Sequence, residues 1–230
     1  MIRLCFAMLL GLTVSSAAAA DVDARAIVQQ WITAGAKVKS VEIEFVQERK
    51  LKALRQPLSK NGRLWFQRPE AFRWQIGEPP TMIAVRGANG SLQVADTTKK
   101  TLRVWTAAEL AAEAGNGKGQ GFGMAGAALP NSLEAFEQVF LIRSAKESNR
   151  PGVWVVRLDL RDKKAGIFVK EILFTIEPAS GSLHQFEIHM RDTSIMSTRV
   201  LKEKKNQAIP SSQFKLATEG YTVEHPASAP

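Results

Sequence analysis

Residues 62–74 place four large aromatic side chains around a single Arg-Pro corner. The segment reads Gly-Arg-Leu-Trp-Phe-Gln-Arg-Pro-Glu-Ala-Phe-Arg-Trp, with one apolar run on each side of Arg68-Pro69. The two-residue period of a strand puts Phe72, Trp74 and Ile76 on one face. So much aromatic surface on one hairpin either builds a core or holds an apolar ligand. Periodicity alone favours core and leaves the ligand alternative open.

Short apolar runs separated by turn residues predict an antiparallel sheet along most of the chain. Asn89-Gly90 is a strong signal for a tight hairpin. Residues 51–60 read as a loose connection, and the basic clusters 163–164 and 202–205 are expected at hairpin tips. The predicted strands are 40–49, 62–68, 71–76, 82–86, 91–96, 101–105, 153–161, 168–177, 183–191, 195–202 and 214–224.

Helical spacing appears in three segments, two of which flank a glycine-rich stretch. Residues 22–38 follow a capping Asp21 or Asp23, and residues 107–114 are rich in Ala, Glu and Leu. A further helix begins at a capping Asn131 and carries Leu133, Phe136, Val139 and Phe140. Residues 115–126 hold six glycines without the Gly-Lys-Ser/Thr ending of a phosphate-binding loop. We therefore expect a mobile loop or lid, and an α+β fold in which helices cover one large, curled antiparallel sheet.

The first twenty residues have the pattern of a secretory signal peptide. Arg3 precedes a short apolar run, and residues 18–20 fit an Ala-x-Ala cleavage site. The alternative is an uncleaved anchor. We expect a signal peptide at 1–20, cleaved near Ala20, one domain at 21–224 and a flexible tail at 225–230. Cys5 is the single cysteine and falls within the signal, so the mature chain is expected to have no thiol chemistry and no lipid anchor.

The chain is basic, with a formal net charge of +9. In an exported protein this charge argues against nucleic acid as the natural partner. It suits anionic lipid headgroups or other anionic components of the envelope, and simple solubility explains it equally well.

The residues that usually carry catalysis or hold metals do not form a recognisable constellation. His184 and His189 are five apart on one predicted strand and therefore point to opposite faces, and His225 lies in the tail. Glu42 and Glu44 read as a solvated strand face opposite Val41, Ile43 and Phe45. There is no His-Glu-x-x-His and no Gly-x-Ser-x-Gly motif. We predict no catalytic residue, no metal site, no cofactor and no enzymatic activity.

Residues 62–74 resemble the Gly-x-Leu/Phe-Trp-hydrophobic-x-Arg-Pro-x-x-Phe-x-Trp signature of LolA, the family of periplasmic carriers of outer-membrane lipoproteins. Residues 40–47 are similar to the first strand of that family, and residues 210–223 to its closing segment. Residues 107–129 depart from the family, because its lid has bulkier apolar residues. The chain thus looks like a divergent member.

The resemblance implies an unclosed antiparallel β-barrel of about eleven strands with an N-terminal helix and a helical lid. It implies that Arg68 hydrogen-bonds the lid and that Phe72 lies at the entrance of an acyl-chain pocket. The alternatives are a structural turn residue for Arg68 and plain core for Phe72. The full predicted set for lipid binding and the lid is Arg68, Phe72, Trp74, Phe45, Trp65, Phe122, Met124 and Phe174.

The function implied is that of a monomeric periplasmic carrier, which binds the acyl chains of lipoproteins or a related lipid and shuttles them toward the outer membrane. Its partners would be the acylated cargo, an inner-membrane donor complex and an outer-membrane acceptor. Two alternatives use the same fold: a carrier of a glycolipid or aryl-polyene lipid, and a sensor or interaction domain. An enzyme would need convergent polar groups in the pocket.

Overall fold

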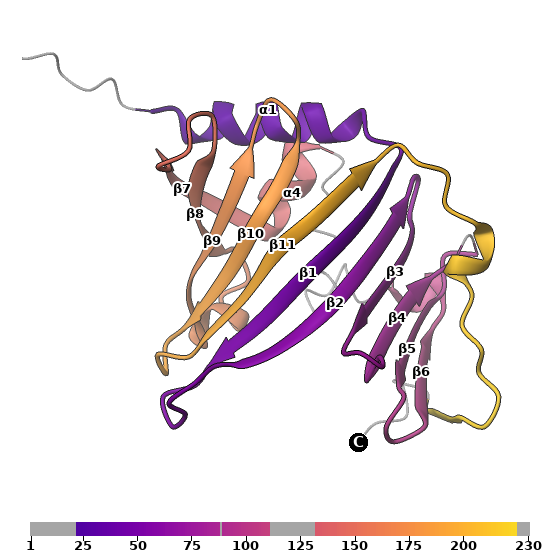
Figure 1. Ribbon diagram of the computed structural model, residues 1–230. Coiled ribbons are helices and arrows are strands. Elements are labelled where there is room, and N and C mark those ends of the chain that lie inside the picture. Colours follow the sequence, from indigo (N-terminus) through magenta and orange to yellow (C-terminus); the bar gives the residue numbers. More distant parts are fainter. Residues whose placement is uncertain (1–21, 88, 111–131, 225–230) are drawn as a thin grey trace, which may run out of the picture.

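The computed structural model describes residues 22–87, 89–110 and 132–224 of the 230-residue chain. One curved sheet dominates it, and helix α1 runs across one end of the strands (Figure 1). The predicted signal peptide, the glycine-rich segment and the tail lie outside the described residues. The strands are β1 (Ser40–Lys50), β2 (Leu58–Gln67), β3 (Ala71–Ile76), β4 (Met82–Arg86), β5 (Leu92–Asp96), β6 (Thr101–Trp105), β7 (Phe140–Glu147), β8 (Trp154–Leu160), β9 (Val169–Glu177), β10 (Ser182–Met190), β11 (Ile195–Lys205) and β12 (Thr222–Glu224).

The twelve described strands form a single open sheet in the order β12-β6-β5-β4-β3-β2-β1-β11-β10-β9-β8-β7. All neighbours are antiparallel except β12 and β6, which are parallel. The join between β1 and β11 brings the first and last long strands together and unites two meanders. The predicted α+β fold, an unclosed antiparallel sheet with an N-terminal helix, is confirmed; the proposed lid falls outside the described residues.

Helix α1 (Ala24–Ala36) forms because its capping and its apolar spacing agree. The Asp23 carboxylate accepts hydrogen bonds from the Arg25 and Ala26 backbone N–H groups, and Val28, Trp31 and Ile32 are buried. Helix α4 (Leu133–Val139) is capped by Ser132, whose Oγ accepts from the Ala135 N–H at 3.1 Å. The prediction of Asn131 as the cap is therefore wrong by one residue.

Two apolar clusters lie on the face of the sheet that α1 and α4 cover, called the inner face below. The larger joins Trp31 of α1 and Phe136 of α4 to the inner face of β7–β10, including Phe140 and Phe174. The smaller contains Val38, Val41, Ile43 and Phe45, with Leu64, Trp74 and Val200 packed against it. The first cluster is an ordinary packed core. The second lies around the segment that carries the aromatic motif.

The C-terminal segment lies against the opposite, outer face of β3–β6 instead of forming the long strand predicted at 214–224. It contains the 3-10 helix η2 (Ser211–Phe214), which packs on β3, and then the short strand β12. Arg73 Nη1 donates to the Lys215 carbonyl at 3.2 Å. On this face Val85, Ala95 and Leu102 are almost fully buried. The C-terminal segment therefore covers part of the outer face at β3.

Three further predictions differ from the structure. Strand β7 was missed because α4 runs directly into it and its second half, Arg143 to Glu147, is charged and exposed, as suits an edge strand. Strand β2 begins at Leu58, so the connection after β1 is shorter than predicted. The basic cluster 202–205 lies within β11, not at a hairpin tip. The cluster 163–164 does lie in a connection, between β8 and β9.

Candidate functional site

Arg68 lies at the corner between β2 and β3 and binds the C-terminal end of α1. Its Nε donates to the Val38 carbonyl at 2.9 Å and its Nη2 to the Gly35 carbonyl at 3.2 Å. Its backbone N–H donates to the Lys39 carbonyl at 2.9 Å. The last carbonyls of a helix lack intrahelical partners and carry negative partial charge, so a guanidinium suits this place. Arg68 therefore fastens α1 to the aromatic hairpin.

The role predicted for Arg68 toward a lid stays a prediction, because residues 111–131 lie outside the described part of the chain. That prediction relied on the ability of one guanidinium to bind several carbonyls at the end of a helix. In this structure the guanidinium of Arg68 does so at the end of α1. The guanidinium also lies 5.8 Å from the centre of the Phe66 ring.

Phe45 and Trp74 stack on the inner face, one strand apart on either side of β2. Their ring centres are 6.3 Å apart with an interplanar angle of 15°. Gly62 of β2 lies directly under Phe45, and a Cβ at Gly62 would overlap the Phe45 ring. The glycine that opens the motif is therefore the residue that lets the two rings meet. Around them the half-buried Leu64 extends the apolar face.

Phe72 lies at the end of the same inner face, opposite Phe66 on β2 and Arg86 on β4. Phe72 is half-buried. Arg86 forms an ion pair with Glu70 at 2.6 Å. The Nε of Arg86 is buried and has no hydrogen-bond acceptor among the described residues. An apolar ring and an unsatisfied cationic N–H donor thus lie side by side at this end of the face.

The other predicted residues are not brought to this place. Trp65 pairs with Glu42 and Arg73 in the register and so lies on the outer face. Phe174 shares the inner face but belongs to the packed core, with its ring centre 5.5 Å from that of Phe140. Phe122 and Met124 lie outside the described residues. The structure therefore groups Phe45, Phe72, Trp74 and Arg68 and separates Trp65 and Phe174 from them.

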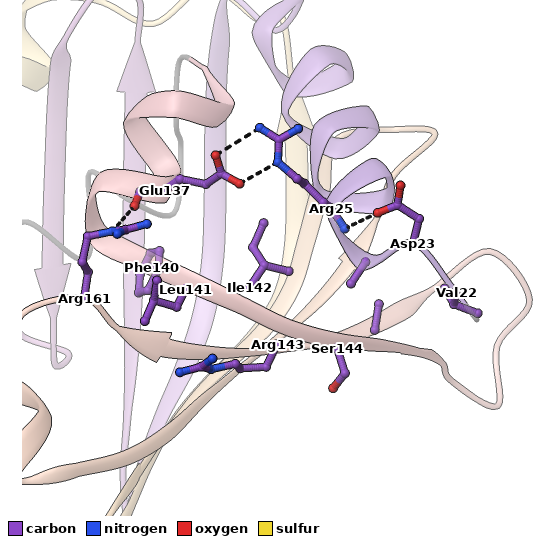
Figure 2. Close-up of a pocket in the computed structure, with 12 residues that line it drawn as sticks. Val22, Asp23, Arg25, Glu137, Phe140, Leu141, Ile142, Arg143, Ser144 and Arg161 are labelled. Atoms are coloured by element: carbon purple, nitrogen blue, oxygen red, sulfur yellow. Dashed lines mark hydrogen bonds and ion pairs between the residues drawn. The ribbon is translucent and has the colours of Figure 1, made fainter.

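A groove of 670 Å³ that sequence reasoning missed lies between the N-terminal end of α1 and the edge strand β7 (Figure 2). Arg25 binds Glu137 of α4 through two contacts, Nε–Oε1 at 2.8 Å and Nη2–Oε2 at 3.1 Å. Arg161 Nε donates to the Glu137 carbonyl at 2.6 Å. The hydrogen bond from Arg25 lowers the pKa of Glu137, and the same bond raises the pKa of Arg25. These groups are paired with one another, and they hold α1 against α4.

The titratable groups show no metal constellation. His189 Nε2 lies 2.7 Å from Glu187 Oε2, and His184 Nε2 lies 3.7 Å from Glu177 Oε2. Across residues 22–87, 89–110 and 132–224 there is no group of three or more His, Cys, Asp or Glu side chains placed to hold a metal ion. Within the same ranges no helix has both the length and the apolar character needed to cross a bilayer.

Comparison with known proteins connects the aromatic motif to a family. Residues 36–107 match the family described as "Outer membrane lipoprotein carrier protein LolA". This segment contains the end of α1, β1–β6 and the Arg68 corner. No curated protein sequence matches the chain.

Solved structures align with the chain at low sequence identity. An uncharacterised conserved protein from Thermus thermophilus aligns with a TM-score of 0.54 and 9% identity, over 89% of this chain and 99% of that one. A putative outer membrane lipoprotein-sorting protein domain from Vibrio parahaemolyticus gives 0.46 and 9%, over 83% and 95%. The Mycobacterium tuberculosis lipoprotein LppX gives 0.44 and 10%, over 82% and 97%. Residues 36–107, which carry the aromatic motif, are therefore similar to the LolA family, and the open antiparallel sheet with its N-terminal helix shares the fold of the Thermus thermophilus protein.

Proposed function

We propose that this protein is a periplasmic carrier, which holds the acyl chains of a lipoprotein or a related lipid in a hydrophobic cavity bounded by the inner face of β1–β4. The observation that carries the proposal is the half-buried apolar row Leu64, Phe72 and Trp74 beside the stacked Phe45. This row lies within the segment that matches the LolA family. A row of side chains that is apolar and only half-buried suits a ligand that comes and goes.

The energetics explain why such a carrier requires this kind of surface. Each buried methylene contributes about 0.8 kcal/mol, so a multiply acylated molecule does not leave a membrane unaided. A carrier must offer comparable apolar surface and then release the ligand. No covalent step is required, and the proposed activity is binding and transfer, not catalysis.

Arg86 gives the proposed ligand site a polar end. The buried Nε–H of Arg86 beside Phe72 has no acceptor among the described residues. An unsatisfied cationic donor beside an apolar surface favours an anionic amphiphile over a neutral one. Lipids with a carboxylate or phosphate near the acyl chains fit this arrangement. An inner-membrane donor and an outer-membrane acceptor complete the proposed route.

The experiment compares two tryptophans of the same hairpin that lie on opposite faces. Delipidated protein is titrated with dansyl-undecanoic acid, and the dissociation constant is measured by fluorescence. Trp74→Ala is expected to weaken binding about tenfold or more, because Trp74 lies on the inner face. Trp65→Ala is the matched control, since Trp65 is also half-buried but lies on the outer face.

Thermal melting of each variant checks that it is folded. Equal loss of affinity in the two folded variants would contradict the inner-face site. In parallel, organic extraction and mass spectrometry of the protein isolated from its native envelope is expected to yield a bound lipid. An empty protein after gentle isolation would count against the carrier proposal as a whole.

A further inference from the structure

Three connections meet at the end of the sheet opposite α1 (Figure 1). They are residues 51–57 between β1 and β2, residues 161–168 between β8 and β9, and residues 191–194 between β10 and β11. We call these three connections the tip surface. It is separate from the inner-face row around Trp74, and it shares only Arg161 with the groove beside β7.

Contacts between neighbouring strands hold the tip surface together. At the end of β1, Arg49 pairs with Met196 and Lys50 with Ile195, so the β1–β2 connection lies next to the β10–β11 turn. The Arg191 N–H donates to the Phe168 carbonyl at 2.9 Å. That bond ties the β8–β9 connection to the same turn. Strands β2 to β9 span four strand spacings here, or about 19 Å.

The tip surface presents large apolar side chains to solvent. Ile167 is 63% exposed and Phe168 66% exposed; Ile167 ends the short 3-10 turn at 165–167, and Phe168 follows it. Leu54 and Leu58 are exposed at the β1–β2 end. Single exposed apolar side chains are common, but here the Ile-Phe pair on the β8–β9 connection and the two leucines at the β1–β2 end, about 19 Å away, gather at one end of the sheet. We call these four side chains the apolar patch. Patches of this kind mark interaction sites.

Basic residues surround this apolar patch. Residues 48–60, 161–170 and 191–194 together contain ten Lys or Arg against three Asp or Glu, in a chain whose formal net charge is +9. With ten basic and three acidic residues, these stretches carry a net charge of +7 out of the +9 of the whole chain. Two basic residues, Lys163 and Lys164, lie three to five positions before Ile167 and Phe168 in the sequence.

We propose that the tip surface docks on an anionic lipid membrane. Apolar side chains enter the boundary between headgroups and acyl chains, while Lys and Arg meet the anionic headgroups, at about 1 kcal/mol for each basic residue near the surface. The exposed Ile-Phe pair favours a lipid surface over the phosphate backbone of a nucleic-acid duplex, which is bound mainly through Lys and Arg. Docking would place the carrier on the membrane from which a lipid is taken or to which it is delivered. The inference does not depend on the inner-face site.

The test measures binding of the full chain to sedimented vesicles. Vesicles of phosphatidylethanolamine and phosphatidylglycerol are compared with vesicles of phosphatidylcholine, at about 0.1 M salt, where surface charges still act over roughly 10 Å. The wild-type protein is expected to bind the anionic vesicles and to bind the neutral ones at least tenfold more weakly. Equal binding to both, or no binding to anionic vesicles, would overturn the proposal.

Two variants of the tip surface have matched controls elsewhere on the protein. Lys163→Glu/Lys164→Glu is expected to weaken binding at least tenfold, whereas Lys146→Glu/Arg150→Glu, with the same change in charge at the other end of the sheet, is expected to have little effect. Ile167→Ser/Phe168→Ser is also expected to weaken binding at least tenfold. Its control is Leu201→Ser/Val223→Ser, which removes comparable exposed apolar surface at other positions.

Each outcome distinguishes a membrane docked on the tip surface from a different binding site or a different kind of binding. If the control variants lose as much affinity as the tip variants, binding follows net charge or hydrophobicity in general and the tip surface is not the docking site. If Ile167→Ser/Phe168→Ser binds the anionic vesicles as well as the wild type does, the apolar contribution is refuted, and the proposal that both apolar and basic side chains dock the protein is overturned. Trp74→Ala is expected to retain vesicle binding, which separates this result from a failure of the inner-face site.

Discussion

The ring of Phe45 on β1 lies directly over Gly62 on β2. The two residues face each other in the strand register, and a Cβ on Gly62 would overlap the ring and lie 2.7 Å from the Gln75 carbonyl oxygen. The missing side chain lets Phe45 reach across β2 and stack on Trp74 of β3. A single glycine therefore converts two aromatic residues on different strands into one apolar surface.

Gly62→Ala is expected to destabilise the protein by about 2 kcal/mol, because the Cβ displaces the Phe45 ring and presses on the β3 backbone. The measurement is the free energy of unfolding in urea, together with the affinity for dansyl-undecanoic acid. Gly166→Ala is the control, since a Cβ there meets nothing within 4 Å. Equal stability of Gly62→Ala and wild type would mean that Phe45 has room to move aside.

Arg68→Leu is expected to reduce stability by about 2 kcal/mol, because it removes charge-assisted hydrogen bonds to the Gly35 and Val38 carbonyls and leaves these carbonyls without that partner. It is also expected to increase the fluorescence of an added apolar probe, since α1 is no longer fastened to the hairpin. Arg63→Leu on the exposed side of β2 is the control. Unchanged stability and unchanged probe fluorescence would exclude Arg68 as the residue that fastens α1.

Gly181→Ala is expected to destabilise the protein by roughly 3 kcal/mol, because Gly181 has a φ of +68° and its Cβ would lie 2.7 Å from the Gly35 Cα. Gly152→Ala separates the two causes, since Gly152 has a φ of +76° but an added methyl there would have no neighbour within 4 Å. Chemical denaturation of both variants gives the difference. A cost as large at Gly152 as at Gly181 would assign the whole effect to the backbone conformation.

Acid is expected to weaken the contact between α1 and α4. The hydrogen bond from Arg25 lowers the pKa of Glu137 in the folded protein, so the folded state binds fewer protons at Glu137 than the unfolded chain does. This contribution is complete above the ordinary Glu pKa of about 4.3 and is lost as the pH falls through the lower folded value. Glu137→Gln is expected to flatten the stability profile below about pH 4.3. An unchanged profile in melting experiments across this range would show that the pair does not contribute.

The sequence predicted well those elements whose signal is local. Strands β3, β4 and β6 begin and end where the alternation of apolar residues and the flanking Pro and Gly residues placed them, and α1 follows from its Asp cap and its buried face. The sequence-based prediction failed for elements whose structure depends on a segment that is distant in the chain. Strand β7 was missed because an edge strand needs no continuous apolar pattern. Of residues 214–224 only 222–224 form a strand, β12 beside β6, while the preceding 3-10 helix packs on β3.

The residues predicted for the candidate site also fall into two groups, those that a local pattern placed correctly and those whose place depends on distant strands. The motif in residues 62–74 was visible in the sequence, and the two-residue period placed Phe72 and Trp74 on one face. The same period was not enough to group residues from different strands, because the register between strands decides which faces coincide. That register sent Trp65 to the outer face and put Phe174 under α1 and α4.

By itself, the sequence determined the fold class, an open antiparallel sheet with an N-terminal helix, and the segment that resembles a lipid carrier, because these depend on local periodicity and on a contiguous motif. Only the tertiary structure decided that Arg68 holds the end of α1, that Gly62 admits the Phe45 ring, and that basic and apolar residues from three connections meet at the tip surface. These depend on the register and curvature of twelve strands, which bring together residues as far apart in the chain as Val41 and Lys205 through contacts that no local pattern records.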